Sequence, residues 1–167
     1  MFAKTDISEM IMNPFRKIAD EWFLLTAGNS EGNYNTMTAS WGGMGTIWGK
    51  SAITAYVRHS RKTFELMEAN EYFSLSFLPK ECRSILSFCG SKSGRDCNKA
   101  KETGLIPVFD EKTTYFEQAE LVFICKKLYS SDLSADGLTA DFVKSFYEKD
   151  ALHRQYIGEI VEILRKS

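Results

Sequence analysis

Short apolar segments separated by turn residues are the feature that most constrains the fold of this chain. The clearest is residues 71–78, EYFSLSFL, where polar and apolar side chains alternate until Pro79. Alternation with a period of two is typical of a β-strand, and proline ends such a strand. Five further stretches have strand character: 21–28, 34–41, 51–58, 115–129 and 156–164.

The helical patterns between these segments are short. They cover residues 60–70, where Ser60 is the expected N-cap, and also 81–88, 98–103 and 141–147. Because strands do not alternate regularly with long helices, a doubly wound parallel sheet is not expected. We predict a mainly β, antiparallel barrel with helical insertions. Residues 1–167 are expected to form a single domain, with 1–20 as an irregular N-terminal arm that holds at most a short helix.

Charge and hydropathy exclude several classes of protein. Lys and Arg number 21 and Asp and Glu 22, so a general nucleic-acid binder is not expected, although a local anion site remains compatible. No run of 18 apolar residues predicts a membrane span, and the acidic N-terminus lacks the apolar core of a signal peptide. We therefore expect a cytoplasmic protein with reduced cysteines.

Several familiar site motifs are absent from the sequence. There is no GXSXG, HEXXH, GXGXXG or P-loop pattern, and His59 and His153 are too few for a three-histidine zinc site. The cysteine spacings match no zinc or dithiol motif, so we expect no metal and mostly buried or incidental thiols. The four are Cys82, Cys89, Cys97 and Cys125.

One polar stretch, NTMTASW at 35–41, is followed by glycines at 42, 43 and 45. Small residues beside glycines let a flat ligand approach the backbone closely, and Trp41 could lie against a ring. The alternative is a strand packed under a helix and followed by a flexible turn.

Two basic loops are candidates for an anion site. RHSRKT at 58–63 lies at a strand-to-helix junction, where a helix N-terminus suits a phosphate. SKSGRD at 91–96 combines hydroxyls, cations and a glycine, and could wrap around an anion. Each could equally be a solvated surface loop. Two such loops in one small domain of net charge −1 favour a single shared phosphate site.

The stretch HRQYIGE at 153–159 holds His153 and Gly158. A lone histidine is more often a structural hydrogen-bonding group than a catalyst. Gly158 within a strand predicts a bulge or a close approach of another chain segment.

These stretches together carry a resemblance. They are LLTAG (24–28), NTMTASWGGMG (35–45), YVRHSRKT (56–63), EYFSLSF (71–77), LSFCGSKSGRDCNKAKETGL (86–105) and HRQYIGEI (153–160). In combination the chain resembles the flavin reductase-like family of FMN-binding split barrels, which includes flavoredoxin-type members. The resemblance spans about residues 21–164, with little from 106–150. It implies a six-stranded antiparallel Greek-key barrel, usually a homodimer, with one FMN per subunit near the dimer interface.

The resemblance also implies the site. The isoalloxazine would lie along the strand Asn35, Thr36, Met37, Thr38, Ala39, Ser40 and Trp41, held by backbone groups and the side chains of Asn35, Thr38 and Ser40, with Trp41 beside it. The phosphate would be held by Arg58, Ser60, Arg61 and Thr63, and Lys92, with Ser91 beside it, would bring a second cation to the phosphate or the ribityl chain. His59 stands where many relatives have proline, so the turn before Ser60 is expected to differ in detail.

The implied reaction is hydride transfer from NADH or NADPH to flavin N5, with electrons passed on to free flavin or an acceptor protein. His153 would be the catalytic candidate, orienting the nicotinamide or stabilising reduced flavin. The main alternative is a non-enzymatic, flavoredoxin-type FMN electron carrier. Two further alternatives are a module of this fold that binds haem, another flavin or nothing, and a pyridoxamine-phosphate oxidase relative, which the 35–41 and 91–96 stretches disfavour.

Overall fold

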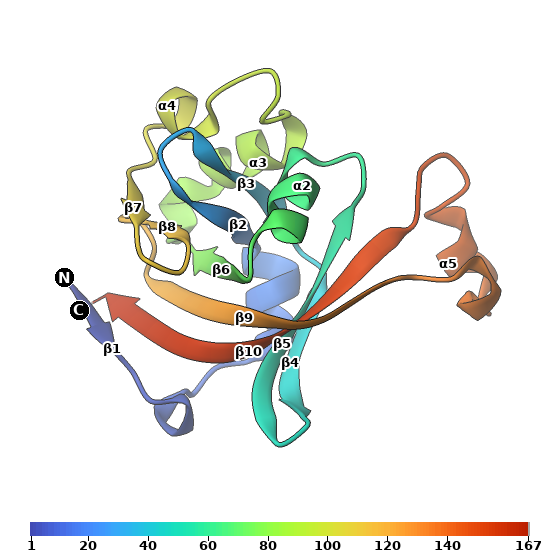
Figure 1. Ribbon diagram of the computed structural model, residues 1–167, viewed down its shortest axis with the longest axis horizontal. Helices are drawn as coiled ribbons and strands as arrows, with labels where there is room; N and C mark the ends of the chain where they lie inside the picture. Colours follow the sequence, from blue (N-terminus) through green and yellow to red (C-terminus); the bar gives the residue numbers. More distant parts are fainter. Residues whose placement is uncertain (167) are drawn as a thin grey trace.

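The computed structural model describes residues 1–166, which form mainly antiparallel β-structure with helical insertions (Figure 1). The strands are β1 Phe2–Lys4, β2 Phe23–Ser30, β3 Asn33–Ala39, β4 Gly42–Ile47, β5 Lys50–Arg58, β6 Tyr72–Phe77, β7 Pro107–Phe109, β8 Thr114–Phe116, β9 Leu121–Asp132 and β10 His153–Lys166. The helices are α1 Pro14–Arg16, α2 Lys62–Ala69, α3 Arg83–Ser91, α4 Lys99–Thr103 and α5 Asp141–Ser145. Single helical turns are η1 Ile7–Glu9, η2 Lys17–Glu21, η3 Lys80–Cys82 and η4 Ala135–Gly137.

Eight of the described strands form the main sheet, in the order β3-β2-β6-β9-β10-β5-β4, with β1 paired to β10. The predicted architecture is confirmed, with two strands more than the six segments identified in the sequence. One is β1. The other is β4, which contains the glycines that were expected to end the preceding strand. Gly42 lies so close to the Thr54 carbonyl that a Cβ would be 2.6 Å from its oxygen, so a glycine at this position allows β4 to pair closely with β5.

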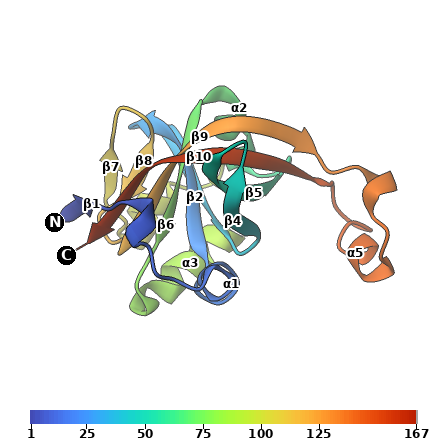
Figure 2. The same cartoon turned by 90° about the horizontal axis from the view of Figure 1, so that it is seen from below.

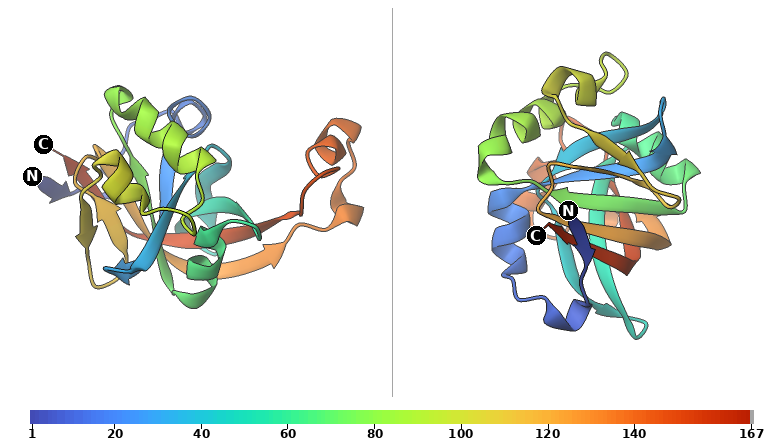
Figure 3. Two further views of the ribbon diagram at one scale, coloured as in Figure 1. Left: turned by 90° about the horizontal axis from the view of Figure 1, so that it is seen from above. Right: turned by 90° about the vertical axis from the view of Figure 1, so that its left-hand side faces the viewer.

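Alternation along the central strands produces a core on both faces of the sheet. In β2, Phe23 and Leu25 pack in one cluster with Phe73, Phe123 and others, while Leu24 packs in a second cluster with Leu86. The second cluster lies beneath α3 and α4, which cover the outside of the sheet (Figure 3). Burial on both faces explains why β9 begins as a continuous apolar run.

The two ends of the chain and the segment between β9 and β10 lie at opposite sides of the molecule. The termini are neighbours because Phe2 pairs with Lys166 (Figures 1 and 3). Residues 133–152, which include α5, project as an arm from the barrel (Figures 1 and 2). Within residues 1–166, no helix is both long and apolar enough to span a membrane.

The structure corrects two local predictions, on the N-terminal arm and on the start of α2, and confirms a third at Gly158. The expected irregular arm is wrong in part, because β1 pairs with β10 and residues 14–21 are helical. Ser60 is not the N-cap of α2: Arg61 occupies that position without a side-chain cap, because the turn closed by Arg61 N and the Arg58 carbonyl delays the helix. Gly158 is confirmed as a close approach, since a Cβ there would lie 2.6 Å from the Phe73 ring.

Candidate functional site

The two basic loops found in the sequence line one cavity of about 290 Å³, called here the basic cavity. One wall is the β5–α2 turn, and the facing wall is the loop that follows α3. Asn35 and Met37 of β3 form a third side. The lining residues are Asn35, Met37, Arg58, Ser60, Arg61, Lys62, Thr63, Ser91, Lys92, Ser93, Gly94, Lys99 and Asp150. All six predicted phosphate ligands therefore lie around one cavity, whereas of the seven predicted ring residues only Asn35 and Met37 do.

The cations of the basic cavity differ in how many hydrogen bonds and ion pairs they already form within the protein. Lys92 is exposed, and within the described residues its ammonium has no hydrogen-bond or ion-pair partner. Arg61 Nη1 donates to the Gly90 carbonyl at 2.8 Å, which leaves other guanidinium N–H groups unused. Lys62 pairs with Glu65 at 2.6 Å. Lys92 is therefore the cation best able to meet an incoming anion.

Arg58 is the most heavily engaged of these cations. Its guanidinium pairs with Asp150 at 2.8 Å, donates to the carbonyls of Phe146 and Ala151, and lies over the Tyr147 ring at 5.6 Å. These contacts attach the base of the projecting arm to the end of β5. Arg58 consequently has a structural role that the sequence did not indicate.

Thr63 and Asn35 connect the N-terminal end of α2 to β3. Thr63 is fully buried, and its hydroxyl oxygen accepts a hydrogen bond from Asn35 Nδ2 at 2.8 Å. The Thr63 hydroxyl proton is not used in that bond. The positive end of the α2 dipole opens at the same place.

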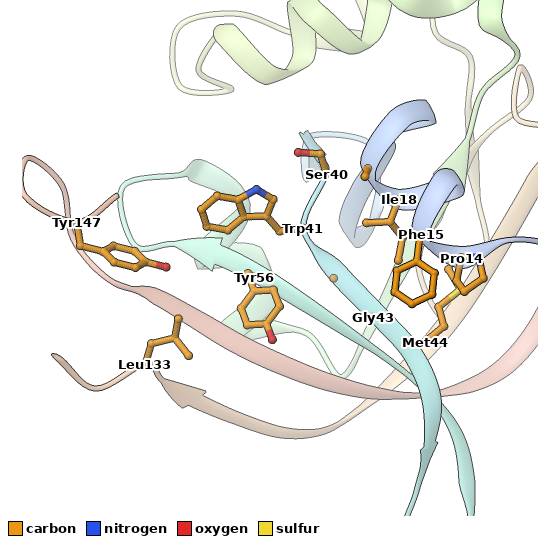
Figure 4. Close-up of a pocket in the computed structure, with 12 residues that line it drawn as sticks. Pro14, Phe15, Ile18, Ser40, Trp41, Gly43, Met44, Tyr56, Leu133 and Tyr147 are labelled. Atoms are coloured by element: carbon orange, nitrogen blue, oxygen red, sulfur yellow. The ribbon is translucent and has the colours of Figure 1, made fainter. Parts of the chain in front are cut away.

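An apolar cavity of about 590 Å³ lies past the other end of β3 (Figure 4). The rings of Trp41, Tyr56 and Tyr147 approach it from one side, and Phe15 and Met44 from the other. Its remaining lining residues are Pro14, Ile18, Ala19, Ser40, Gly42, Gly43 and Leu133, so none of the lining side chains is charged. A flat, uncharged ring suits such walls.

His153 begins β10 and lies near the apolar cavity. It pairs across the sheet with Arg58, and its ring centroid is 4.9 Å from that of Trp41. Its Nδ1 is 3.0 Å from the Tyr147 hydroxyl. Burial, aided by the positive charge of Arg58, lowers the pKa of His153 to about 4. The imidazole is therefore neutral near pH 7 and can hydrogen-bond without adding charge.

Three predicted residues of the β3 strand are engaged away from the basic cavity. The Thr36 hydroxyl bonds with Thr26 Oγ1 and the Leu25 carbonyl. The Thr38 hydroxyl donates to the Leu86 carbonyl of α3 at 2.5 Å, and Ala39 is buried in the core. Any ligand contact at these positions would have to come from backbone groups.

His59 is fixed by an ion-pair network behind the β5–α2 turn. Its Nε2 lies 2.7 Å from Asp132, whose carboxylate also receives two bonds from Arg154. Arg154, followed by His59, holds the pKa of Asp132 well below its usual range. Arg154 also pairs with Glu68, in the last turn of α2, at 2.8 Å, so the network ties β10 to that helix.

Sequence reasoning missed Lys99, Asp150 and Tyr147. Lys99 in NKAKET has the appearance of a solvated helical lysine, yet it is 5% exposed and lines the basic cavity. Asp150 and Tyr147 belong to the arm, where the sequence offered no motif. Only their positions in space bring them to the site.

Comparison with known proteins agrees with this architecture. Residues 15–167 match the model of the flavin reductase like domain family, while no curated protein matches the sequence. Similar solved structures include the flavoredoxin of Desulfovibrio vulgaris (Miyazaki F), at 19% identity and a TM-score of 0.68, covering 87% of this chain and 69% of that one. The flavoredoxin of Methanosarcina acetivorans is 19% identical with a TM-score of 0.70, and the match covers 88% of this chain and 69% of that one.

A third similar structure is an FMN-binding domain of a flavin reductases-like enzyme from Shewanella baltica OS155. It is 16% identical with a TM-score of 0.69, and the match covers 99% of this chain and 77% of that one. At these identities the likeness concerns the fold. The split-barrel fold expected from the sequence is thereby confirmed.

Proposed function

Because the chain belongs to the flavin reductase-like domain family, we propose that it binds FMN and oxidises NADH or NADPH, passing the electrons to free flavin or an acceptor protein. The observation that carries this proposal is the pairing of two cavities along β3. One is rich in cations, and the other is aromatic and uncharged. Together they suit a phosphate ester attached to a flat ring.

The donor set fits the phosphate end of FMN. Lys92 supplies an unpaired ammonium among the described residues, Arg61 retains unused N–H groups, and the Thr63 hydroxyl proton lies at the helix N-terminus. Charge-assisted hydrogen bonds of this type are the strong ones in proteins. Arg58 contributes positive potential, although Asp150 already holds its guanidinium.

The residues at the other end of β3 fit the ring. Backbone groups around Ser40 would bind its polar edge, and Trp41 would flank it. FMN, when bound, supplies the hydride and electron chemistry. His153, neutral and held by Tyr147, would orient a nicotinamide through its remaining ring nitrogen without repelling or attracting charge.

A homodimer is part of the proposal. Large side chains around the apolar cavity are exposed: Phe15 at 83%, Phe146 at 51% and Trp41 at 39%. Clustered exposed aromatics of this kind are typical of interfaces. A second copy of the chain would cover them and close the ring site. A cytoplasmic location stays a prediction.

The visible spectrum of the purified protein, with and without added FMN, tests the function. Flavin bands near roughly 370 and 450 nm, typical of protein-bound oxidised flavin, should bleach on anaerobic addition of NADH or NADPH. Bands that resist both nucleotides but bleach with dithionite would favour the electron carrier instead. Absence of flavin, together with no binding of added FMN, would contradict the proposal.

A further inference from the structure

Lys99 is a buried lysine at the start of α4. Its Nζ donates to the Thr36 carbonyl at 2.8 Å and to the Cys89 carbonyl at 2.7 Å. These two bonds join α4 to β3 and to the last turn of α3. An ammonium has three protons, so one donor remains after both bonds are made.

No carboxylate compensates this charge among the described residues. Lys99 has no ion pair, and the ionisable groups that act on it are the Cys89 and Cys97 thiols and the Arg61 guanidinium. Burial lowers its pKa, as expected for a charge removed from water. A buried ammonium is costly unless a counter-charge reaches it.

The basic cavity offers the place where a counter-charge can enter. Lys99 is part of its wall, and it also borders a neighbouring cavity of about 310 Å³ whose other charged lining residues are Arg95 and Asp96. Asp96 forms no ion pair with Lys99 and is not among the groups that shift its pKa. Lys99 and Arg61 donate to the consecutive carbonyls of Cys89 and Gly90, immediately before the 91–94 loop. Two cations are thus fixed side by side at the base of that loop.

We propose that the third proton of Lys99 is donated to the phosphate of the bound flavin, making Lys99 a binding residue that selects FMN over riboflavin. This inference rests on the proposed function. It explains why a lysine without an acidic partner is held inside the fold at the wall of a cation-lined cavity. A purely structural lysine would need no access to that cavity.

The test compares Lys99→Gln and Lys99→Met with Lys101→Met, an exposed lysine of the same helix. Glutamine keeps a donor for the carbonyls but removes the charge, so it guards against failure of the methionine variant to fold. Affinities for FMN and riboflavin are measured by fluorescence titration. We expect FMN binding to fall about 10- to 150-fold in both Lys99 variants, with riboflavin changed less than about threefold and Lys101→Met unaffected.

Equal losses for both flavins would overturn the inference, because they would indicate a structural role alone. Unchanged FMN affinity would overturn it as well. If the wild-type protein binds neither flavin, the proposed function fails, and inorganic phosphate then serves as the probe. Phosphate should raise the melting temperature of the wild-type protein and of Lys101→Met but not of Lys99→Gln; the same rise in all three, or none, would contradict a role for Lys99.

Discussion

Arg58 Nη1 lies 2.8 Å from Asp150 Oδ2, so an acidic side chain in the wall of the basic cavity is paired with one of its cations. The pair joins the end of β5 to the segment that precedes β10. A phosphate entering the cavity meets the Asp150 carboxylate as a like charge and as a competitor for Arg58. The arm therefore opposes anion binding while it helps to fix the site.

Asp150→Asn should strengthen FMN binding. The amide keeps the size of the side chain and removes the negative charge, which at this half-exposed position is worth about 1 kcal/mol or less, or up to roughly fivefold in affinity. Titration with FMN and riboflavin measures the effect, and riboflavin should not respond. Asp141→Asn, in α5 on the same arm, is the control. Weaker FMN binding in Asp150→Asn would mean that the ion pair with Arg58 is needed to build the site.

Lys92→Ala should weaken FMN binding selectively. The Lys92 ammonium has no partner among the described residues, so its removal breaks no hydrogen bond or ion pair there. The expected loss is about 1.5–3 kcal/mol, or roughly 10- to 150-fold, for FMN and almost nothing for riboflavin. Rising salt should reduce the difference between wild type and variant, because Lys92 is exposed.

Lys80→Ala, a lysine of η3 that does not line the basic cavity, controls for general charge effects. A similar loss in both variants would point to long-range attraction instead of a contact. Arg61→Ala is a less selective test, because it also removes the bond to Gly90.

The fold was predictable where local pattern and burial agree, as in β6. It was not predictable where a neighbour determines the structure. Glycines 42, 43 and 45 indicate the end of a strand in the sequence, yet residues 42–47 pair with β5 as β4, and Gly42 passes close to the Thr54 carbonyl. The three residues of β1 carry little signal of their own and depend on pairing with β10.

For the site, the number of basic residues in the two loops was enough to predict one shared phosphate site. It was not enough to rank the residues by their ability to bind phosphate. The sequence does not distinguish Arg58 from Lys92 as a phosphate ligand. In the structure, Arg58 is held by Asp150, whereas Lys92 has no partner among the described residues. Lys99 was missed because a lysine in a short polar helix is normally solvated. Its burial depends on carbonyls of β3 and α3, which lie 63 and 10 residues away in sequence.

Gly158→Ala should destabilise the protein. A Cβ at this position would lie 2.6 and 2.7 Å from two carbon atoms of the Phe73 ring and 3.0 Å from Cys125 Cβ. Relief requires moving packed side chains on two central strands, which costs about 1–3 kcal/mol. Urea unfolding of wild type, Gly158→Ala and Gly45→Ala measures this loss of stability. A Cβ at Gly45, in β4, would have no atom within 4 Å, so that variant should remain close to wild type.

His153→Ala should impair nucleotide oxidation more than flavin binding. Its ring lies beside Trp41 and is oriented by Tyr147, next to the apolar cavity proposed for the flavin ring, where a nicotinamide would have to approach. We expect a loss of roughly 10- to 100-fold in kcat/KM for NADH or NADPH, the range of a positioned hydrogen-bonding group, with FMN affinity within about threefold. Steady-state oxidation by the FMN-loaded protein tests this. Unchanged oxidation and unchanged FMN affinity would remove His153 from the site.

His153 should also make stability depend on pH in a defined window. Burial and Arg58 lower its pKa to about 4 in the folded protein, against an ordinary value near 6.5 when the chain is unfolded. Above pH 6.5 the imidazole is neutral in both states, and its contribution to stability is fully present. As pH falls from about 6.5 to 4, His153 binds a proton in the unfolded chain but not in the folded protein, so the free energy of unfolding decreases.

The separation between these two pKa values corresponds to a loss on the order of 3 kcal/mol by pH 4. Urea unfolding of wild type and His153→Gln across that range isolates it, because the carboxyl groups that titrate there are common to both proteins and cancel in the difference. The wild-type curve should fall more steeply than that of the variant between pH 6.5 and 4. Parallel curves would show that His153 accepts its proton as easily in the folded protein as in the unfolded chain, and that the neutral imidazole assigned to the nicotinamide site is wrong.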